Sequence, residues 1–215
     1  MDRNVPFYQR CDRLGPLVAE ALKRRHFEAY YCAEREEALE KALELIPKHD
    51  LVSWGGSISI EQIGLKARIK ADGYRYLDRD EAKSPDERME RMRQALLCDT
   101  YLTSSNAITR DGQLFNIDGN GNRVAAMSYG PRSVIVVAGI NKVVSGIEAA
   151  MDRVRNYVAP INVNRFPDSK TPCLETGMCS DCIAAKCACT YMVTTRLCKP
   201  AGRIKVILLG DELGL

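Results

Sequence analysis

The sequence predicts an α/β fold in which a mostly parallel sheet carries helices on both faces. Strand-like and helix-like segments alternate along the 215 residues, and this alternation is typical of parallel β-α-β units. Val134 to Ala138 is an unbroken apolar and β-branched run, as expected of a central strand covered on both faces. No internal repeat or linker divides the chain, so we expect residues 1–215 to form one domain.

Five other short segments have the composition of strands. Each is rich in β-branched, aromatic or other apolar residues and is bounded by polar or turn-forming residues. These segments are Phe27–Cys32, Asp50–Trp54, Tyr74–Leu77, Asp99–Thr103 and Arg203–Leu209. Leu114–Ile117 follows an Asp111–Gly112 turn and is expected to form one arm of a hairpin.

The segments between the strands repeat apolar residues at helical spacing. An opening helix is expected from Pro6 to Arg25, and Ala38 to Ile46 has an amphipathic pattern that stops at Pro47. The clearest local signal is Ser84–Glu87, which combines an N-cap serine, a proline at the first helical position and a capping-box glutamate. A later amphipathic helix is expected from Ile147 to Val158.

The composition and charge exclude several classes of protein. With 46% hydrophobic and 27% charged residues, the chain has the make-up of a globular protein. A net charge of +3, with Arg35 followed directly by two glutamates, argues against nucleic acid as a partner. The polar start Met1–Asn4 shows no signal peptide, and the longest apolar run, Val134–Ile140, is too short to span a bilayer. We therefore expect a cytoplasmic protein.

The chain contains nine cysteines, and six of them lie in residues 160–200, where no clean periodicity is present. In a reducing compartment an odd number of cysteines favours metal ligands or redox groups over a disulfide framework. Metal ligation within an insertion at about residues 165–200 would explain why so long an irregular stretch occurs in a compact domain. Cys11, Cys32 and Cys98 lie in or beside expected helices and strands, where cysteine packs as a small hydrophobe.

Cys179 and Cys182 form a C-x-x-C pair, a spacing that brings two thiolates of one turn to the same metal centre. Three interpretations stay open. A 4Fe–4S cluster is favoured because cysteines are in surplus and no histidine lies nearby. A structural zinc ion with four cysteine ligands is the second, although zinc ribbons usually contain two C-x-x-C pairs. The third is a set of redox-active thiols without metal.

A glycine turn follows the expected strand Asp50–Trp54. Gly55 and Gly56 come directly before Ser57, where a helix is expected to begin. A turn of this kind can bind an anion through its free N–H groups, but the same residues also suit a tight turn with a serine N-cap. Glu61 lies one helical turn further on and is a candidate acid or base.

Amide and cationic side chains follow other expected strand ends. Asn106 and Asn120 lie just beyond two of these ends with Arg123 close by, and Asn141 and Lys142 directly follow the long apolar run. In open α/β sheets, ligands bind in the crevice outside the carboxyl ends of the strands. The sequence therefore predicts that these residues bind a small carboxylate or phosphate.

Several segments together resemble the lactate utilization (LUD) family, and the resemblance covers essentially the whole chain. The matching segments are Trp54–Ser57, Ser105–Thr109, Asn116–Ala126, Gly139–Lys142, Gly202–Ile204 and Gly210–Gly214. The resemblance implies a fold like that of the sugar-phosphate isomerase and CoA-transferase superfamily. It also implies that Gly55, Gly56 and Ser57 hold an anionic group, and it suggests a link to lactate oxidation.

The resemblance further implies a set of metal ligands. The family members that look most similar carry a C-terminal motif that matches Cys173, Cys179, Cys182 and Cys189. Cys187 and Cys198 have no counterpart in that motif, and either one is an alternative fourth ligand.

Three functional hypotheses follow. The first is an iron–sulfur protein of lactate or other 2-hydroxy-acid oxidation, working with flavin or iron–sulfur partner proteins. The second is a non-redox isomerase, transferase or hydrolase that binds a small anion beside the cluster, with Glu61, Asp118 or Asn106 in catalysis. The third is a non-catalytic subunit with a structural zinc site. Assembly into a homo-oligomer is compatible with all three.

Overall fold

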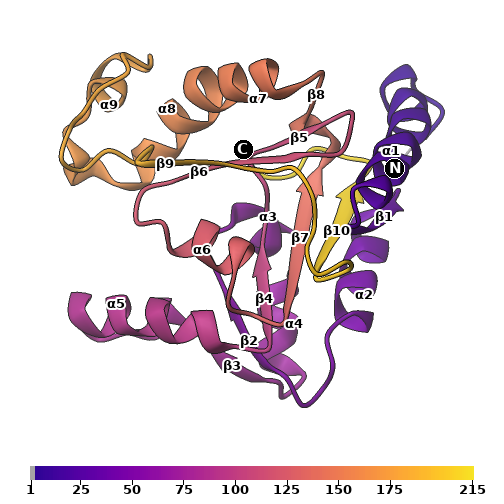
Figure 1. The fold of residues 1–215 in the computed structure, drawn as a ribbon, viewed down its shortest axis with the longest axis horizontal. Helices are drawn as coiled ribbons and strands as arrows, with labels where there is room; N and C mark the ends of the chain where they lie inside the picture. The colour runs from indigo at the N-terminus through magenta and orange to yellow at the C-terminus, as the bar shows by residue number, and fades with distance from the viewer. Residues whose placement is uncertain (1–2) are drawn as a thin grey trace.

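The computed structural model describes residues 3–215, and its main element is a six-stranded parallel sheet (Figure 1). The strand order is β1-β10-β7-β4-β2-β3, and every neighbouring pair is parallel. The strands are β1 (Glu28–Cys32), β2 (Leu51–Trp54), β3 (Arg75–Leu77), β4 (Thr100–Thr103), β7 (Ser133–Gly139) and β10 (Ile204–Leu209). The predicted fold class and all six predicted strands of this sheet are confirmed.

Strand β7 is buried on both faces, as its composition predicts. Val134 and Val136 point into one hydrophobic core, whereas Ile135 and Val137 point into the other. All four side chains have 0% exposure. Because side chains of a strand alternate between faces, a strand with a core on each side needs an uninterrupted apolar run.

Helices cover the two faces of this sheet. Helix α1 (Pro6–Arg24) packs on one core, and α6 (Asn122–Ser128) contributes Met127 to the same core. Helices α2 (Arg35–Glu44), α3 (Ile58–Gln62) and α4 (Leu65–Ala71) pack on the other. Buried alanine and larger aliphatic side chains on these helices make the contacts with the cores, which explains the amphipathic patterns of the helices.

Helix α5 (Pro85–Gln94) begins where the capping signal predicts. The Ser84 side-chain oxygen accepts a hydrogen bond from the Glu87 N–H at 3.1 Å. The Glu87 carboxylate reaches back to the N–H of Lys83, at 2.7 Å, one residue earlier than in a standard capping box.

A second sheet of four strands was not predicted as a separate unit. Its order is β8-β5-β6-β9, and β6 pairs antiparallel with both of its neighbours. The strands are β5 (Ala107–Thr109), β6 (Leu114–Asp118), β8 (Val143–Val144) and β9 (Tyr191–Thr195). The β5–β6 hairpin confirms the predicted hairpin arm. Figure 1 shows this sheet, with α7 (Ile147–Arg153) and α8 (Ala159–Asn162), beyond the end of the first sheet toward which β7 and β10 point.

The cysteine-rich stretch has more regular structure than its sequence indicates. It contains short 3-10 turns at Val163–Arg165 and Pro167–Ser169, helix α9 (Pro172–Thr176), and strand β9 at the edge of the second sheet. Every residue of β9 is at least partly exposed, so the strand has no buried face to impose an alternating apolar pattern. This explains why periodicity did not reveal it. A π-helical turn, Val154–Val158, joins α7 to α8 within the predicted helix.

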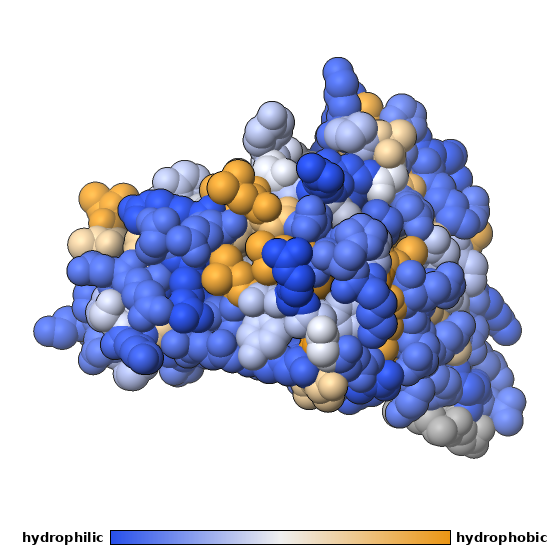
Figure 2. All heavy atoms as spheres, turned by 90° about the horizontal axis from the view of Figure 1, so that it is seen from below, coloured by the Kyte–Doolittle hydropathy of each residue, from blue (hydrophilic) through white to orange (hydrophobic). Residues whose placement is uncertain are grey.

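The outer surface is mostly hydrophilic. Figure 2 shows one face on which hydrophilic residues predominate and hydrophobic residues form small groups. None of the helices within residues 3–215 has the length and apolar character needed to cross a membrane.

The β5–β6 turn should depend on Gly112. This residue has φ +89°, and a Cβ atom there would lie 2.5 Å from the carbonyl carbon and oxygen of Ala21 in α1. We expect Gly112→Ala to lower the free energy of unfolding by roughly 3 kcal/mol, because backbone strain and overlap add together. Urea denaturation measures this change.

Gly73→Ala is the matched control. Gly73 has φ +72°, but no atom lies within 4 Å of the added Cβ. Its expected cost is only about 1–2 kcal/mol. Equal losses in the two variants would contradict the assigned contact between the turn and α1.

Candidate functional site

A cavity of about 700 Å³ lies at the carboxyl end of the parallel sheet. Gly56–Ser59 after β2, Thr103–Asn106 after β4 and Lys142 after β7 all line it. These three strands are neighbours in the sheet, so parallel pairing brings their carboxyl ends to one place. This is the position at which open α/β sheets bind ligands. The second sheet and α8 also line the cavity, through Asp118 and Asn162 among other residues.

The lining of this cavity is strongly cationic. Two carboxylates, Asp118 and Asp168, line it. The cations are three times as many: Arg79, Arg88, Arg123, Lys142, Arg165 and Lys186. An excess of fixed positive charge within a concave surface favours small anions.

The glycine turn lies against two of these arginines. A Cβ atom at Gly56 would lie 2.5 Å from Nη2 of Arg79 and 3.8 Å from Nη2 of Arg165, so a side chain at this position would displace the end of the Arg79 side chain. The buried Nε of Arg79 has no hydrogen-bond partner within the part of the chain that the structure describes. Ser57 caps α3 by accepting a hydrogen bond from the N–H of Ile60, at 3.4 Å. The cavity therefore has an anion-seeking end at Gly56, Ser57, Arg79 and Arg165.

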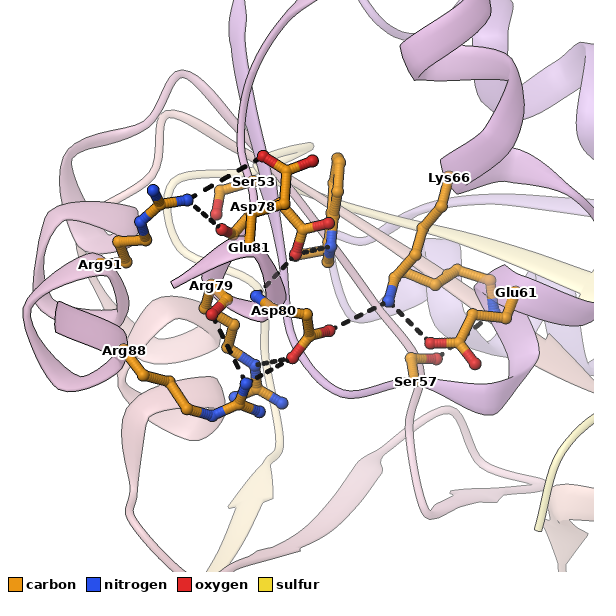
Figure 3. Close-up of polar contacts among 12 residues, drawn as sticks. Ser53, Ser57, Glu61, Lys66, Asp78, Arg79, Asp80, Glu81, Arg88 and Arg91 are labelled. Atoms are coloured by element: carbon orange, nitrogen blue, oxygen red, sulfur yellow. Dashed lines mark hydrogen bonds and ion pairs between the residues drawn. The ribbon is translucent and has the colours of Figure 1, made fainter. Parts of the chain in front are cut away.

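Glu61 does not reach this cavity. Figure 3 shows Lys66 between the carboxylates of Glu61 and Asp80, with the guanidinium groups of Arg79 and Arg88 on the other side of Asp80. The ion-pair distances are 2.7 Å from Lys66 to Glu61, 3.7 Å from Lys66 to Asp80, and 2.7 Å from Arg88 to Asp80. The expected acid–base role of Glu61 therefore finds no support from its position.

Arg123 is already saturated by contacts within the protein. Its Nη1 donates to the Ser104 carbonyl at 3.0 Å and to Oδ1 of Asn116 at 2.6 Å. Its Nη2 donates to Oδ1 of Asn106 at 2.9 Å and to the Ile117 carbonyl at 2.6 Å. Burial lowers the pKa of this guanidinium. Arg123 thus ties the loop after β4 to β6, and it has less capacity to bind a ligand than the sequence indicates.

Two other predicted residues also have structural partners. Oδ2 of Asp118 accepts hydrogen bonds from the N–H groups of Arg123 and Val124, so this carboxylate caps α6. Asn141 does not line the cavity, because its amide holds the C-terminal segment through Leu213 N–H and the Gly214 carbonyl.

Asn106 and Asn120 line the cavity as predicted, whereas Gly55 lies outside its lining. Oδ1 of Asn106 is occupied by Arg123 and by the Ile117 N–H, which leaves its amide nitrogen as the group that can face a ligand. A Cβ at Gly55 would approach the Tyr101 hydroxyl to 3.0 Å, so this glycine makes room for a buried tyrosine.

Lys142 is the most unusual residue of the cavity. Its side chain is buried, with 4% of the residue exposed. Its Nζ lies 3.0 Å from both Ser59 Oγ and Ser104 Oγ, and no carboxylate among residues 3–215 lies within ion-pair distance. Burial, together with the charges of Arg153 and Arg123, lowers the pKa of Lys142 to about 7.

Five of the six clustered cysteines line one smaller cavity, of about 60 Å³: Cys173, Cys179, Cys182, Cys187 and Cys189. All five are partly exposed and free of disulfide bonds. The structure thus brings together the four predicted ligands and Cys187. It does not bring Cys198, which is 1% exposed in the core beneath α1.

Charge within the cysteine cavity is partly balanced. Arg155, on the π-helical turn, forms an ion pair with Asp181 at 2.6 Å, and hydrogen bonding to Cys179 is the main cause that raises the pKa of its guanidinium. Burial, and then the nearby thiol of Cys187, raises the pKa of the Cys189 thiol to about 12. Coordination of a metal by Cys189 would therefore release the thiol proton.

The two cavities share a wall. Cys187 and Ala188 line both of them, so the cysteine group lies directly beside the cationic cavity. Within residues 3–215 no three or more histidine, cysteine, aspartate or glutamate side chains are arranged to hold a metal ion.

Sequence reasoning missed several residues of the cavity. Arg79 and Arg88 reach it from parts of the chain where basic and acidic residues alternate, and such patterns are typical of solvated surface. Arg165 reaches it from a segment in which no motif marks a site. Ser59 and Ser104 lie within the recognised polar segments, but only the fold reveals their contact with Lys142.

Comparisons with known proteins agree with this fold. Residues 16–209 match the family model described as LUD domain. A search of curated proteins finds no match. A crystal structure of a DUF162 family protein from Deinococcus radiodurans is similar, with a TM-score of 0.55 and 11% identity over 93% of this chain and 98% of that chain. A structure of eIF2B delta from Chaetomium thermophilum aligns with a TM-score of 0.31 and 18% identity, over 67% of this chain and 58% of that one. A similarity of that size supports no argument.

The burial of Lys142 predicts a pH-dependent stability. The unfolded chain holds this proton up to a pKa of about 10.4, whereas the folded chain releases it near 7, so unfolding takes up a proton between these values. Stability should therefore rise with pH across the window from 7 to 10. We expect Lys142→Met to remove roughly 2–4 kcal/mol of this rise.

Urea denaturation of both proteins at several pH values measures the difference. Subtracting one curve of unfolding free energy against pH from the other cancels the contributions of the other groups that titrate in this range. Parallel curves for wild type and variant would show that Lys142 keeps its proton on folding.

Proposed function

Because the chain belongs to the LUD domain family, we propose that it is an iron–sulfur protein that acts on a small 2-hydroxy or 2-oxo carboxylate, in lactate utilization or a related pathway. The observation that carries this proposal is the shared wall of the two cavities. Five cysteines surround one cavity, six cations line the other, and Cys187 with Ala188 separates them.

The cysteine cavity suits a 4Fe–4S cluster by its donor set. Cys173, Cys179, Cys182 and Cys189 would hold the cluster, because Cys187 also faces the cationic cavity. The ligands are thiols, the usual ligands of a 4Fe–4S cluster, and Arg155 offsets part of the negative charge.

The number and spacing of the thiols support a cluster over a single zinc ion. Five cysteines line the cavity, one more than a tetrahedral zinc site uses. Zinc ribbons usually contain two C-x-x-C pairs, whereas Cys179 and Cys182 form the single pair in this segment.

The cationic cavity suits a small carboxylate. Arg79 has a buried nitrogen without a partner, and Arg165 lies close to the same glycine turn. A carboxylate bound there would receive charge-assisted hydrogen bonds from guanidinium groups and from the Ser57 hydroxyl. The amide nitrogen of Asn106 and the hydroxyl groups of Ser59 and Ser104 are available to a hydroxyl or carbonyl oxygen of the same ligand.

A bound cluster of this type supplies one-electron transfer. Oxidation of a 2-hydroxy acid to the 2-oxo acid releases two electrons and two protons, so flavin or iron–sulfur partner proteins must accept the electrons. Lys142 and its two serine neighbours offer groups that can take up and pass on a proton beside the bound substrate.

The first prediction concerns the metal. Anaerobically purified protein should be brown and should contain about four irons and four sulfides per chain. Cys179→Ser should lose most of this iron, because it removes one of four ligands. A colourless protein with one zinc per chain would overturn the proposal.

Two further variants act as controls. Cys198→Ser changes a cysteine outside the cavity and should keep the full iron content, although it is expected to melt at a lower temperature because the site is buried. Cys187→Ser should also keep the iron, whereas Cys189→Ser should lose it. The reverse result for this pair would assign Cys187 as the fourth ligand.

The second prediction concerns the anion. Lactate, pyruvate or phosphate should raise the melting temperature at constant ionic strength, by a few degrees at about 100 times the dissociation constant. Arg79→Gln should abolish this rise because it removes the guanidinium that lies beside the glycine turn. Arg93→Gln, which changes an exposed arginine paired with Glu90, should retain it. Equal responses of the two variants would exclude an anion site at the glycine turn.

A further inference from the structure

Lys142 occupies the floor of the cationic cavity without a charged partner. It ends the short 3-10 turn Ile140–Lys142 that follows β7, in which residues 134–139 are all buried. Because Lys142 comes directly after this buried strand, its backbone is fixed in the core, and its side chain lines the cavity. Burial of an ionisable group normally comes with an ion pair, since an isolated buried charge is costly.

The contacts of Nζ are two hydroxyl groups. Ser59 on α3 and Ser104 after β4 each lie 3.0 Å from Nζ, and their own oxygens are 3.2 Å apart. The three groups form a closed triangle in which protons can be exchanged. A Cβ at Gly214 would lie 2.5 Å from Ser59 Oγ and 3.1 Å from Nζ, so the C-terminal segment closes the triangle on one side.

The charged groups that face this triangle are cations. Arg123 of α6 and Arg153 of α7 are both partly buried, and their positive charges help to lower the pKa of Lys142. The carboxylates of the neighbouring elements are engaged elsewhere. Glu61 of α3 pairs with Lys66, and Asp118 caps α6. With cations and hydroxyls around it, the ε-amino group is held in its uncharged form near neutral pH.

An uncharged amine at the base of an anion-binding cavity is a nucleophile. We propose that Lys142 forms a covalent imine with the carbonyl carbon of a small 2-oxo carboxylate. The proposed imine rests on the proposed function, because that function brings the carboxylate into the cavity. It goes beyond that function by assigning a covalent step and the residue that performs it.

The step balances without an external reactant. The Nζ lone pair attacks the carbonyl carbon, and one of the two Nζ protons passes to the carbonyl oxygen to give a carbinolamine. The remaining Nζ proton then passes to the hydroxyl, the carbon–oxygen bond breaks, and water leaves as the carbon–nitrogen double bond forms. Ser59 and Ser104 lie within hydrogen-bond distance of Nζ and can relay these protons.

Reductive trapping tests the imine directly and does not require a known activity. The anaerobically purified protein is incubated at neutral pH with pyruvate or glyoxylate and sodium cyanoborohydride, and digested peptides are mapped by mass spectrometry. We expect a single reduced adduct on Lys142. Lys66, which contacts two carboxylates outside the cavity, should be modified on the order of a hundred-fold less.

Matched samples separate the possible results. Lactate has no ketone carbonyl and should give no adduct. Lys142→Arg keeps a hydrogen-bond donor between the two serines but cannot form the imine, so it should bind pyruvate without a covalent adduct. Adduct on Lys142 in the wild type, with these two controls blank, supports the proposal.

Two results would overturn it. If pyruvate raises the melting temperature but Lys142 stays unmodified, the imine is refuted and the proposed anion-binding function stays intact. If pyruvate and glyoxylate neither bind nor form an adduct, the imine and the proposed anion-binding function are both refuted. Adducts spread over exposed lysines in proportion to their exposure also refute the imine, because they would show that Lys142 has no special reactivity.

Discussion

Parallel pairing of β2, β4 and β7 is the constraint on which the rest of this structure depends. Because these strands are neighbours and run in the same direction, the residues that follow them are brought together at one edge of the sheet. The glycine turn, the serines after β4 and Lys142 come from distant parts of the sequence and meet only there. The two-sided burial of β7 holds this edge in place.

The second sheet turns that edge into an enclosed site. Arg123 connects it to the first by donating to the Ser104 carbonyl, to Asn106 and to Asn116. Beyond this connection, β9 continues from the cysteine-rich stretch and pairs with β6 over its whole length. The cysteine cavity is therefore attached to the wall of the cationic cavity through the backbone. A group bound in the cysteine cavity would therefore lie next to a ligand in the cationic cavity.

Much of this architecture could be predicted from the sequence, because local patterns reflect it. The apolar run of β7 and the Ser84 cap depend on neighbouring residues, and both are found where expected. The grouping of Cys173, Cys179, Cys182 and Cys189 around one cavity also follows from spacing and family resemblance. Strand β9 escaped detection because it is a partly exposed edge strand.

The directions of side chains could not be predicted in this way. Glu61 lies close to the glycine turn in sequence, yet its carboxylate pairs with Lys66 outside the cavity. Arg123 follows a promising run of amides, but its hydrogen bonds are used within the protein. Arg79 and Arg165 are part of the anion-seeking end, although neither belongs to a recognisable motif. Each of these outcomes depends on tertiary contacts between segments far apart in the chain.

The most direct measurement of the central claim is anomalous diffraction at the iron absorption edge from crystals of anaerobically purified protein. We expect iron signal within the cavity bounded by Cys173, Cys179, Cys182 and Cys189, on the far side of Ala188 from the cationic cavity. Electron density that instead joins these cysteines as disulfides, or iron bound at another place, would contradict the assignment.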